Sequence, residues 1–151
     1  MLYRMVVKKK IRQAFDQVNK RQWDDLMKSI APNIHHRFGG DTAISGQRHD
    51  RETLRRWFER LARVLPNLQL EINDIWVQGW PWHTMVFVQW DGTATRLDGG
   101  KYFQHAVHVI TLRWGKIHAI DVFEDSQAVA RALQAQAAVG LAEAIAEPIL
   151  S

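Results

Sequence analysis

The sequence predicts an α+β fold in which helices cover the open side of one strongly curved antiparallel sheet. Apolar residues recur mostly at helical spacing up to Leu65, at strand spacing from Leu68 to Phe123, and at helical spacing again from Ser126. The chain has 151 residues, of which 46% are hydrophobic, and no cysteine. This length and apolar content suit one globular domain, and the lack of cysteine excludes disulfides and thiolate chemistry.

Two helices are expected in the first part of the chain. Residues 5–20 show an amphipathic pattern. Its apolar stripe consists of Val7, Ile11, Phe15 and Val18. Residues 22–30 predict a second, short helix, because Asp24 and Asp25 lie near the positive end of its dipole and Ala31-Pro32-Asn33 ends it.

A short strand and a third helix follow. Residues 34–38 are a strand candidate closed by Gly39-Gly40, and a loop then leads to Asp50, which we expect to cap the third helix. Pro66 ends that helix. Its apolar face consists of Leu54, Trp57, Phe58, Leu61, Val64 and Leu65.

From Leu68 onward the alternation predicts an antiparallel meander. The strands are expected at residues 68–78, 82–91, 101–113 and 116–123. The turns between them are expected at Asp91-Gly92, Asp98-Gly99-Gly100 and Trp114-Gly115.

A last helix is expected from about Ser126, capped by Asp125 and broken near Gly140. We expect a single domain over residues 1–135 and an Ala-rich helical tail over residues 136–151. The end of this tail, from Leu141, carries an apolar stripe, so it is expected to pack on a partner subunit or to fray.

The charge balance permits an anionic partner without requiring one. Lys and Arg number 20 and Asp and Glu number 16, which gives a net charge of +4. Because no recognised nucleic-acid motif accompanies Lys8 to Lys10 and the arginines of the third helix, we interpret these residues as solvated surface and expect no nucleic-acid partner. No apolar run is long enough to span a membrane, and Arg4 interrupts the N-terminus too early for a signal peptide. We therefore expect a cytoplasmic protein without a membrane partner.

The order of these elements, together with several short motifs, resembles the SnoaL-like group of the nuclear transport factor 2-like (NTF2-like, ketosteroid isomerase-like) superfamily. The motifs lie at residues 18–26, 34–40 and 44–46, and at Gly115-Lys116-Ile117 followed by Phe123-Glu124-Asp125. The resemblance covers about residues 5–135. It implies a cone-shaped sheet of the NTF2-like or cystatin-like kind, with an apolar pocket and frequent dimerisation through the sheet. Members include ketosteroid isomerase, polyketide cyclases, epoxide hydrolases and non-catalytic association domains.

The register of this family, combined with strand alternation, selects the side chains expected to face the pocket. Asp121 then falls on the outer face, whereas a register shifted by one residue would place Asp121 in the pocket in place of Val122. The expected ligand-binding residues are Trp57, Tyr102, Gln104, Trp82, Thr84, Phe38 and Val122. Trp90 has the same parity, and these aromatic rings either stack on a planar ligand or fill the cone as ordinary core.

His36 and His108 are the candidates for proton transfer, because imidazole titrates near neutral pH and both are expected to face the apolar pocket. The alternative is that each is a hydrogen-bonded core residue. A metal bound by His36, His108 and Glu124 is geometrically conceivable, but His105 and His108 face opposite sides of their strand. We predict no metal and no cofactor.

The resemblance also places the residues that act in other members. The base of ketosteroid isomerase corresponds to Phe38, its tyrosine to Ala14 and its protonated acid to His108. The last-strand carboxylate of cyclases and epoxide hydrolases corresponds to Val122. Because the usual carboxylates are missing, two functions stay open. One is an isomerase, cyclase or hydrolase that uses His108 and His36, with a small apolar or aromatic substrate. The other is a non-catalytic ligand-binding or dimerisation module.

A homodimer is expected because the outward face of the sheet is more apolar than a solvated face should be. The side chains concerned are Phe103, Val107, Val109, Met85 and Phe87.

Overall fold

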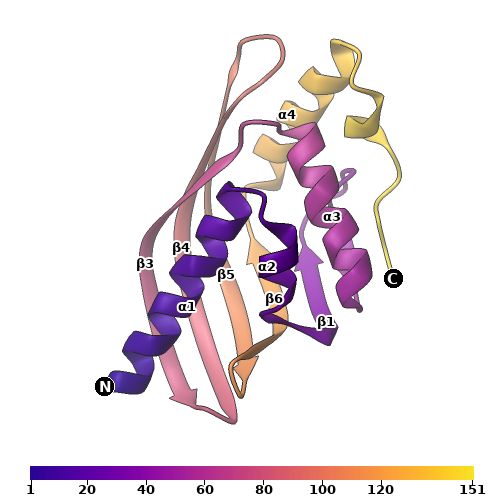
Figure 1. The fold of residues 1–151 in the computed structure, drawn as a ribbon. Coiled ribbons are helices and arrows are strands. Elements are labelled where there is room, and N and C mark those ends of the chain that lie inside the picture. Colours follow the sequence, from indigo (N-terminus) through magenta and orange to yellow (C-terminus); the bar gives the residue numbers. More distant parts are fainter.

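The computed structural model describes residues 1–151 and shows a six-stranded mixed sheet with four α-helices and one short 3₁₀-helix (Figure 1). The helices are α1 (Leu2–Asn19), α2 (Trp23–Met27), α3 (Arg51–Val64), α4 (Ser126–Ala138) and the 3₁₀-helix η1 (Ala142–Ile145). The strands are β1 (Ile30–Phe38), β2 (Gly46–Arg48), β3 (Gln69–Trp80), β4 (His83–Thr95), β5 (Lys101–Arg113) and β6 (Lys116–Phe123).

The sheet has the strand order β2-β1-β6-β5-β4-β3, so the meander predicted from residue 68 is confirmed as β3 to β6. The expectation of a wholly antiparallel sheet is wrong in one place, because β1 pairs parallel with β6. β1 meets its neighbour only after the meander has returned, so no hairpin sets its direction. The three-residue strand β2, which sequence reasoning took for loop, extends the sheet beyond β1.

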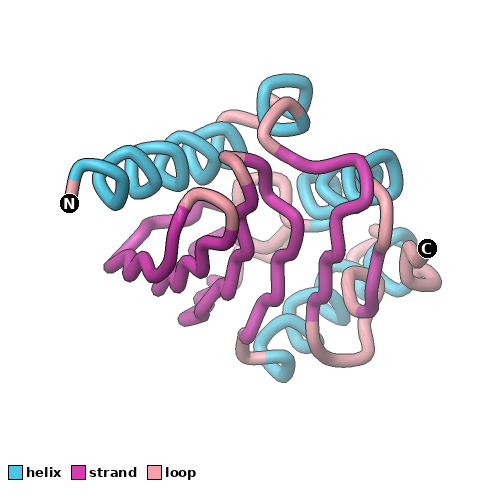
Figure 2. Tube along the Cα trace, turned by 90° about the horizontal axis from the view of Figure 1, so that it is seen from below, coloured by secondary structure: helices cyan, strands magenta, loops and turns pink.

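The sheet is open and curved, and α1, α2 and α3 cover its concave face (Figures 1 and 2). Its ladders are irregular between Ile72 and Asp74 in β3 and between Thr111 and Leu112 in β5. Such irregularities bend a strand and increase its twist. The predicted apolar stripe of α1 is confirmed, since Val7, Ile11 and Phe15 are buried between this helix and the rest of the protein.

Both predicted helix caps are present. Asp50 Oδ1 accepts a hydrogen bond from the Thr53 amide at 2.8 Å, and Asp125 Oδ1 accepts from the amides of Gln127 and Ala128 at 3.1 Å. α4 ends just before Gly140, whose φ of +104° is the left-handed conformation that favours glycine.

The turn expected at Asp91-Gly92 is wrong, because β4 continues through both residues to Thr95, and the chain reverses only at the turn that was also expected at Asp98-Gly99-Gly100. Gly92 has a different role. A Cβ atom at this position would lie 2.9 Å from the indole ring of Trp90, so the glycine makes room for that ring.

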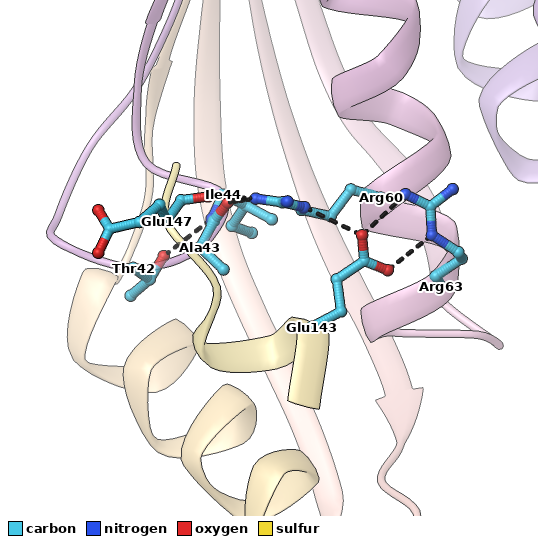
Figure 3. Close-up of polar contacts among 7 residues, drawn as sticks. All are labelled: Thr42, Ala43, Ile44, Arg60, Arg63, Glu143 and Glu147. Atoms are coloured by element: carbon cyan, nitrogen blue, oxygen red, sulfur yellow. Dashed lines mark hydrogen bonds and ion pairs between the residues drawn. The ribbon is translucent and has the colours of Figure 1, made fainter. Parts of the chain in front are cut away.

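The C-terminal tail packs on its own chain, which corrects the expectation that it packs on a partner or frays. Glu143 accepts hydrogen bonds from Arg60 and Arg63 of α3, and Arg60 Nη1 also donates to the carbonyl of Glu147 at 2.6 Å (Figure 3). These arginines, assigned above to solvated surface, help to hold the tail against the body of the protein, together with Ala144, which is buried in the core. No helix combines the length and apolar character needed to cross a bilayer.

Candidate functional site

A cavity lies between the concave face of the sheet and the helices that cover it. It is lined by 22 residues, of which 20 are hydrophobic, and the two exceptions are His36 and His108. The space not filled by atoms, counted together with the solvent at the mouth of the cavity, is about 850 Å³. The volume that the centre of a water molecule can occupy is only about 70 Å³. The larger figure includes open solvent, so the smaller one describes what fits without movement of side chains. It falls well below the roughly 300 Å³ typical of drug-sized ligand sites, so the rings partly fill the cone.

His36 lies on β1 and is only 1% exposed. The Nε of Arg48 donates a hydrogen bond to His36 Nδ1 at 3.0 Å, and the indole of Trp57 packs against the imidazole at a centroid distance of 4.4 Å. Burial, followed by the positive charge of Arg48, holds the pKa of His36 well below its usual value. His36 is therefore neutral at physiological pH.

His108 lies on β5 and borders the cavity. The indole Nε1 of Trp90 donates a hydrogen bond to His108 Nδ1 at 2.6 Å, and the ring of Phe15 meets the imidazole edge-on at 5.3 Å. Burial lowers the pKa of His108 to about 3. This second histidine is also neutral, and its hydrogen-bond partner is again on Nδ1.

These contacts fix the chemistry that the two histidines can perform. Because each Nδ1 accepts a hydrogen bond, the proton of each neutral ring sits on Nε2. Both imidazole rings line the cavity, and the hydrogen bond of each is made through Nδ1. Each ring thus presents an N–H donor to the cavity. Proton abstraction would require a charged imidazolium in an apolar cavity, which burial disfavours.

The strand register places both histidines on the same face of the sheet. His108 pairs with Val122 of β6, which pairs with Phe38 of β1, while His36 pairs with Ile120 one row away. Asp121 lies on the outer face, where Arg37 Nη1 donates to its carboxylate at 3.3 Å. The predicted parity of this strand is therefore confirmed.

Four of the seven residues expected to bind ligand border the cavity, namely Phe38, Trp57, Tyr102 and Val122. Trp57 is held by a hydrogen bond from its Nε1 to the Ile44 carbonyl at 2.8 Å. Tyr102 accepts a hydrogen bond from Gln104, and burial raises its pKa to about 12, so its hydroxyl stays protonated.

The other three residues are placed elsewhere. The side chain of Gln104 bonds the Tyr102 hydroxyl and both backbone groups of Asp125, so it ties β5 to the start of α4. Thr84 is buried beneath the start of α1, where its hydroxyl bonds Tyr3 and the Trp80 carbonyl. Trp82 lies in the β3–β4 turn and is 56% exposed, because β4 begins one residue later than expected.

Sequence reasoning missed the two residues that orient the histidines. Trp90 has the inward parity, but nothing in the sequence shows that its N–H reaches His108 across neighbouring strands. Arg48 is the larger omission, because it is fully buried in a segment that looked like loop. Its guanidinium donates to His36 and to the carbonyls of Ser45, Gly46 and Ile149, and burial lowers its pKa to about 10.

The remaining histidines and acids do not gather around the cavity. His35 contacts His49 outside it, His105 pairs with Asp91 on the outer face, and Glu124 lies beside Gly39. No group of three or more His, Asp or Glu side chains is arranged to hold a metal ion.

The curved sheet and its covered cavity have the NTF2-like fold, and comparison with solved structures shows the same fold in other proteins. An NTF2-like protein of unknown function from Burkholderia pseudomallei is 14% identical, with a TM-score of 0.72, over 82% of this chain and 94% of that one. TerC, co-crystallised with polyporic acid, is 16% identical, with a TM-score of 0.68, over 83% of this chain and 96% of that one. SalBIII, an epoxide hydrolase/cyclase-like enzyme of pyran ring formation in the polyether salinomycin, is 20% identical, with a TM-score of 0.69, over 84% and 96%.

The sequence profile of the SnoaL-like domain matches residues 11–120. The chain therefore belongs to the SnoaL-like family, as the sequence motifs indicated. No curated protein sequence matches it. Because these sequence identities are 20% or lower, the structural similarities establish the fold but no activity.

Proposed function

We propose that this protein binds a small, largely apolar or aromatic molecule that carries a hydrogen-bond acceptor. The observation that carries the proposal is the pair of neutral histidines, the only two non-hydrophobic residues among the 22 that line the cavity. An apolar pocket with a few convergent polar groups is the usual form of a small-molecule site. The bound acceptor, such as a carbonyl oxygen, takes a hydrogen bond from Nε2 of His36 or His108.

The free space limits the ligand to about the size of a single substituted ring. A polycyclic ligand requires the rings of Trp57 and Phe15 to move, because they occupy the cone. TerC shows that a relative of the same fold was crystallised with an organic acid, which supports a small-molecule role.

A second candidate is catalysis of ring closure or ring opening, which the similarity to SalBIII favours. In that reaction the two N–H groups would polarise an oxygen atom of the substrate, because the pKa values of both histidines are too low for general acid catalysis by imidazolium. Binding and catalysis share the same donors.

The proposal is tested with acetophenone and α-methylstyrene, which differ in shape by little more than the replacement of a carbonyl oxygen by a methylene. The protein is expected to bind acetophenone about 2- to 10-fold more tightly, as one neutral hydrogen bond contributes about 0.5–1.5 kcal/mol. Replacing His108 with phenylalanine is expected to reduce or remove this preference. Titration calorimetry or ligand-observed NMR measures both affinities.

The control variant is His35→Phe, because His35 lies on the same strand as His36 but outside the cavity. It is expected to leave the preference unchanged. Failure of both compounds to bind, or a preference that survives when His36→Phe and His108→Phe are combined in one variant, contradicts the proposal.

We also propose that the protein forms a homodimer through the outer face of the sheet. Phe103 is 58% exposed there, and Met85, Phe87, Val107 and Val109 are only partly covered. Sedimentation is expected to show a dimer at micromolar concentration, and Val109→Glu is expected to convert it to a monomer by placing a charge in the interface. A wild-type monomer at that concentration contradicts the proposal.

A further inference from the structure

One end of the molecule carries an exposed aromatic cluster that the cavity does not use. Trp80, Trp82 and Trp114 are 65%, 56% and 72% exposed. Trp80 and Trp82 stack with centroids 6.0 Å apart and planes at 11°, and Trp82 lies 6.4 Å from Trp114. Trp80 is the last residue of β3, Trp82 lies in the β3–β4 turn and Trp114 lies in the β5–β6 turn. A hydrogen bond from the Trp114 amide to the Pro81 carbonyl joins the two turns.

The start of α1 completes this end of the molecule (Figure 1). Met1, Tyr3 and Arg4 line a shallow hollow together with Gly79 and Trp80. The exposed aliphatic side chains beside it are Met1, Leu2, Met5 and Val6, which are between 56% and 98% exposed. We call this surface, made of residues 1–6, 80–83 and 114–116, the tryptophan tip.

The tryptophan tip lies in a part of the chain that is basic and free of acids. Residues 1–15, 75–90 and 109–120, which contain it, include no Asp or Glu, although the chain has 16. They hold seven of the 20 Lys and Arg residues, and none of the seven forms an ion pair. These are Arg4, Lys8, Lys9, Lys10, Arg12, Arg113 and Lys116. Lys116 donates only to the backbone carbonyl of Lys28.

We propose that the tryptophan tip docks on the surface of an anionic lipid bilayer. Tryptophan side chains favour the headgroup level of a membrane, where the ring is shielded and the indole N–H stays hydrated. The exposed start of α1, which is apolar at residues 1–6 except for Arg4 and basic at residues 8–10, matches the boundary between acyl chains and headgroups. The unpaired cations complement the negative potential of anionic lipids.

Two other occupants fit these observations less well. A second copy of the chain would bring two like-charged surfaces together, which is unfavourable. A single-stranded nucleic acid needs free ring faces for its bases, but Trp80 and Trp82 already stack on one another. The exposed aliphatic residues of α1 also give a nucleic acid nothing to recognise. Docking of the tip on a membrane surface does not require a membrane-spanning helix, and no helix of the structure is long and apolar enough to be one.

The test is co-sedimentation with phosphatidylcholine vesicles prepared with and without phosphatidylserine. Binding is expected only with phosphatidylserine and is expected to weaken as salt rises. Trp82→Ser combined with Trp114→Ser is expected to weaken binding by about tenfold or more. Lys9→Gln is expected to weaken it about fivefold, the effect of one basic residue near an anionic surface.

Two matched controls lie away from the tip. Leu97, in the β4–β5 loop at the opposite end, is 55% exposed, close to the 56% of Trp82. Leu97→Ser and Arg131→Gln, on α4, are expected to bind vesicles as the unmodified protein does. All these positions are exposed, so circular dichroism is expected to show an unchanged fold.

Several results would overturn the proposal. These are equal binding to both kinds of vesicle, no binding to either, and equal losses in the tip and control variants. Self-association of the lipid-free protein that Trp82→Ser abolishes would assign the tip to a second copy. Salt-dependent retention on heparin or single-stranded DNA that Trp82→Ser abolishes, without vesicle binding, would assign it to a nucleic acid.

Discussion

Replacing Arg48 with leucine is expected to lower the free energy of unfolding by about 3–5 kcal/mol. The Arg48 side chain is fully buried, and it is the hydrogen-bond partner of three backbone carbonyls and of His36 Nδ1. Leucine fills part of the volume but removes the donor from these acceptors, of which His36 Nδ1 and the Ser45 carbonyl are buried. Each unsatisfied buried group costs about 1–3 kcal/mol.

The same substitution is expected to loosen the C-terminal tail and to change His36. Arg48 Nη1 holds the carbonyl of Ile149 at 2.7 Å, and Ser151 reaches the backbone of Gln47 and His49 just beyond it. Without the Arg48 charge, the second cause of the low pKa of His36 disappears. The pKa of His36 is therefore expected to rise, and its Nδ1 becomes free to carry the proton.

Urea unfolding measures the loss of stability, and histidine ¹⁵N chemical shifts report the tautomer of His36. Arg56→Leu is the matched control, because Arg56 is an exposed arginine on the adjacent helix α3. It is expected to change the free energy of unfolding by less than about 0.5 kcal/mol. A loss below about 1 kcal/mol for Arg48→Leu would mean that the buried guanidinium contributes no net hydrogen bonding.

The strand faces and the helix ends around the cavity could be predicted from the sequence, because both depend on local geometry. Side chains alternate strictly along a strand, so the parity that placed Phe38, His108 and Val122 inward and Asp121 outward follows once the buried face is known. The helix ends were equally readable, because Asp50 and Asp125 cap helices through local hydrogen bonds.

The parts that could not be predicted depend on contacts between distant segments. The segment containing Arg48 is polar and only three residues long as a strand, so its sequence looks like a loop. Its burial depends on pairing with β1 and on cover by the tail, about 100 residues later in the chain. Gly92 was taken for a turn because its steric role, making room for the Trp90 ring, is visible only in three dimensions.

The protein is expected to lose stability as the pH falls below about 6.5, before most carboxylates titrate. In the unfolded chain both cavity histidines have an ordinary pKa near 6.5. In the folded protein burial lowers the pKa of His108 to about 3 and holds that of His36 well below 6.5. The unfolded state therefore binds up to two more protons than the folded state over this interval.

The sign follows from linkage, because stability falls with decreasing pH wherever the unfolded state binds more protons. Each histidine contributes a slope of up to about 1.4 kcal/mol per pH unit, so the pair gives up to about 2.7. The effect is absent above pH 6.5 and, for His108, is complete near its folded pKa of about 3. Glu124 acts in the opposite direction, since burial raises its pKa, and the lowered pKa values of Asp50 and Glu143 add to the loss at more acidic pH.

Urea unfolding between pH 7.5 and pH 5 isolates the histidine contribution from most carboxylates. His108→Phe is expected to halve the slope, even though the loss of an acceptor for Trp90 Nε1 lowers the stability at every pH. His83→Gln, at an exposed position of β4, controls for the loss of one histidine. A free energy of unfolding that stays level from pH 7.5 to pH 5 would show that the histidines take up protons in the folded state. The two rings would then be able to exchange protons with a ligand, and the acid–base role first inferred from the sequence would replace the role of neutral donors.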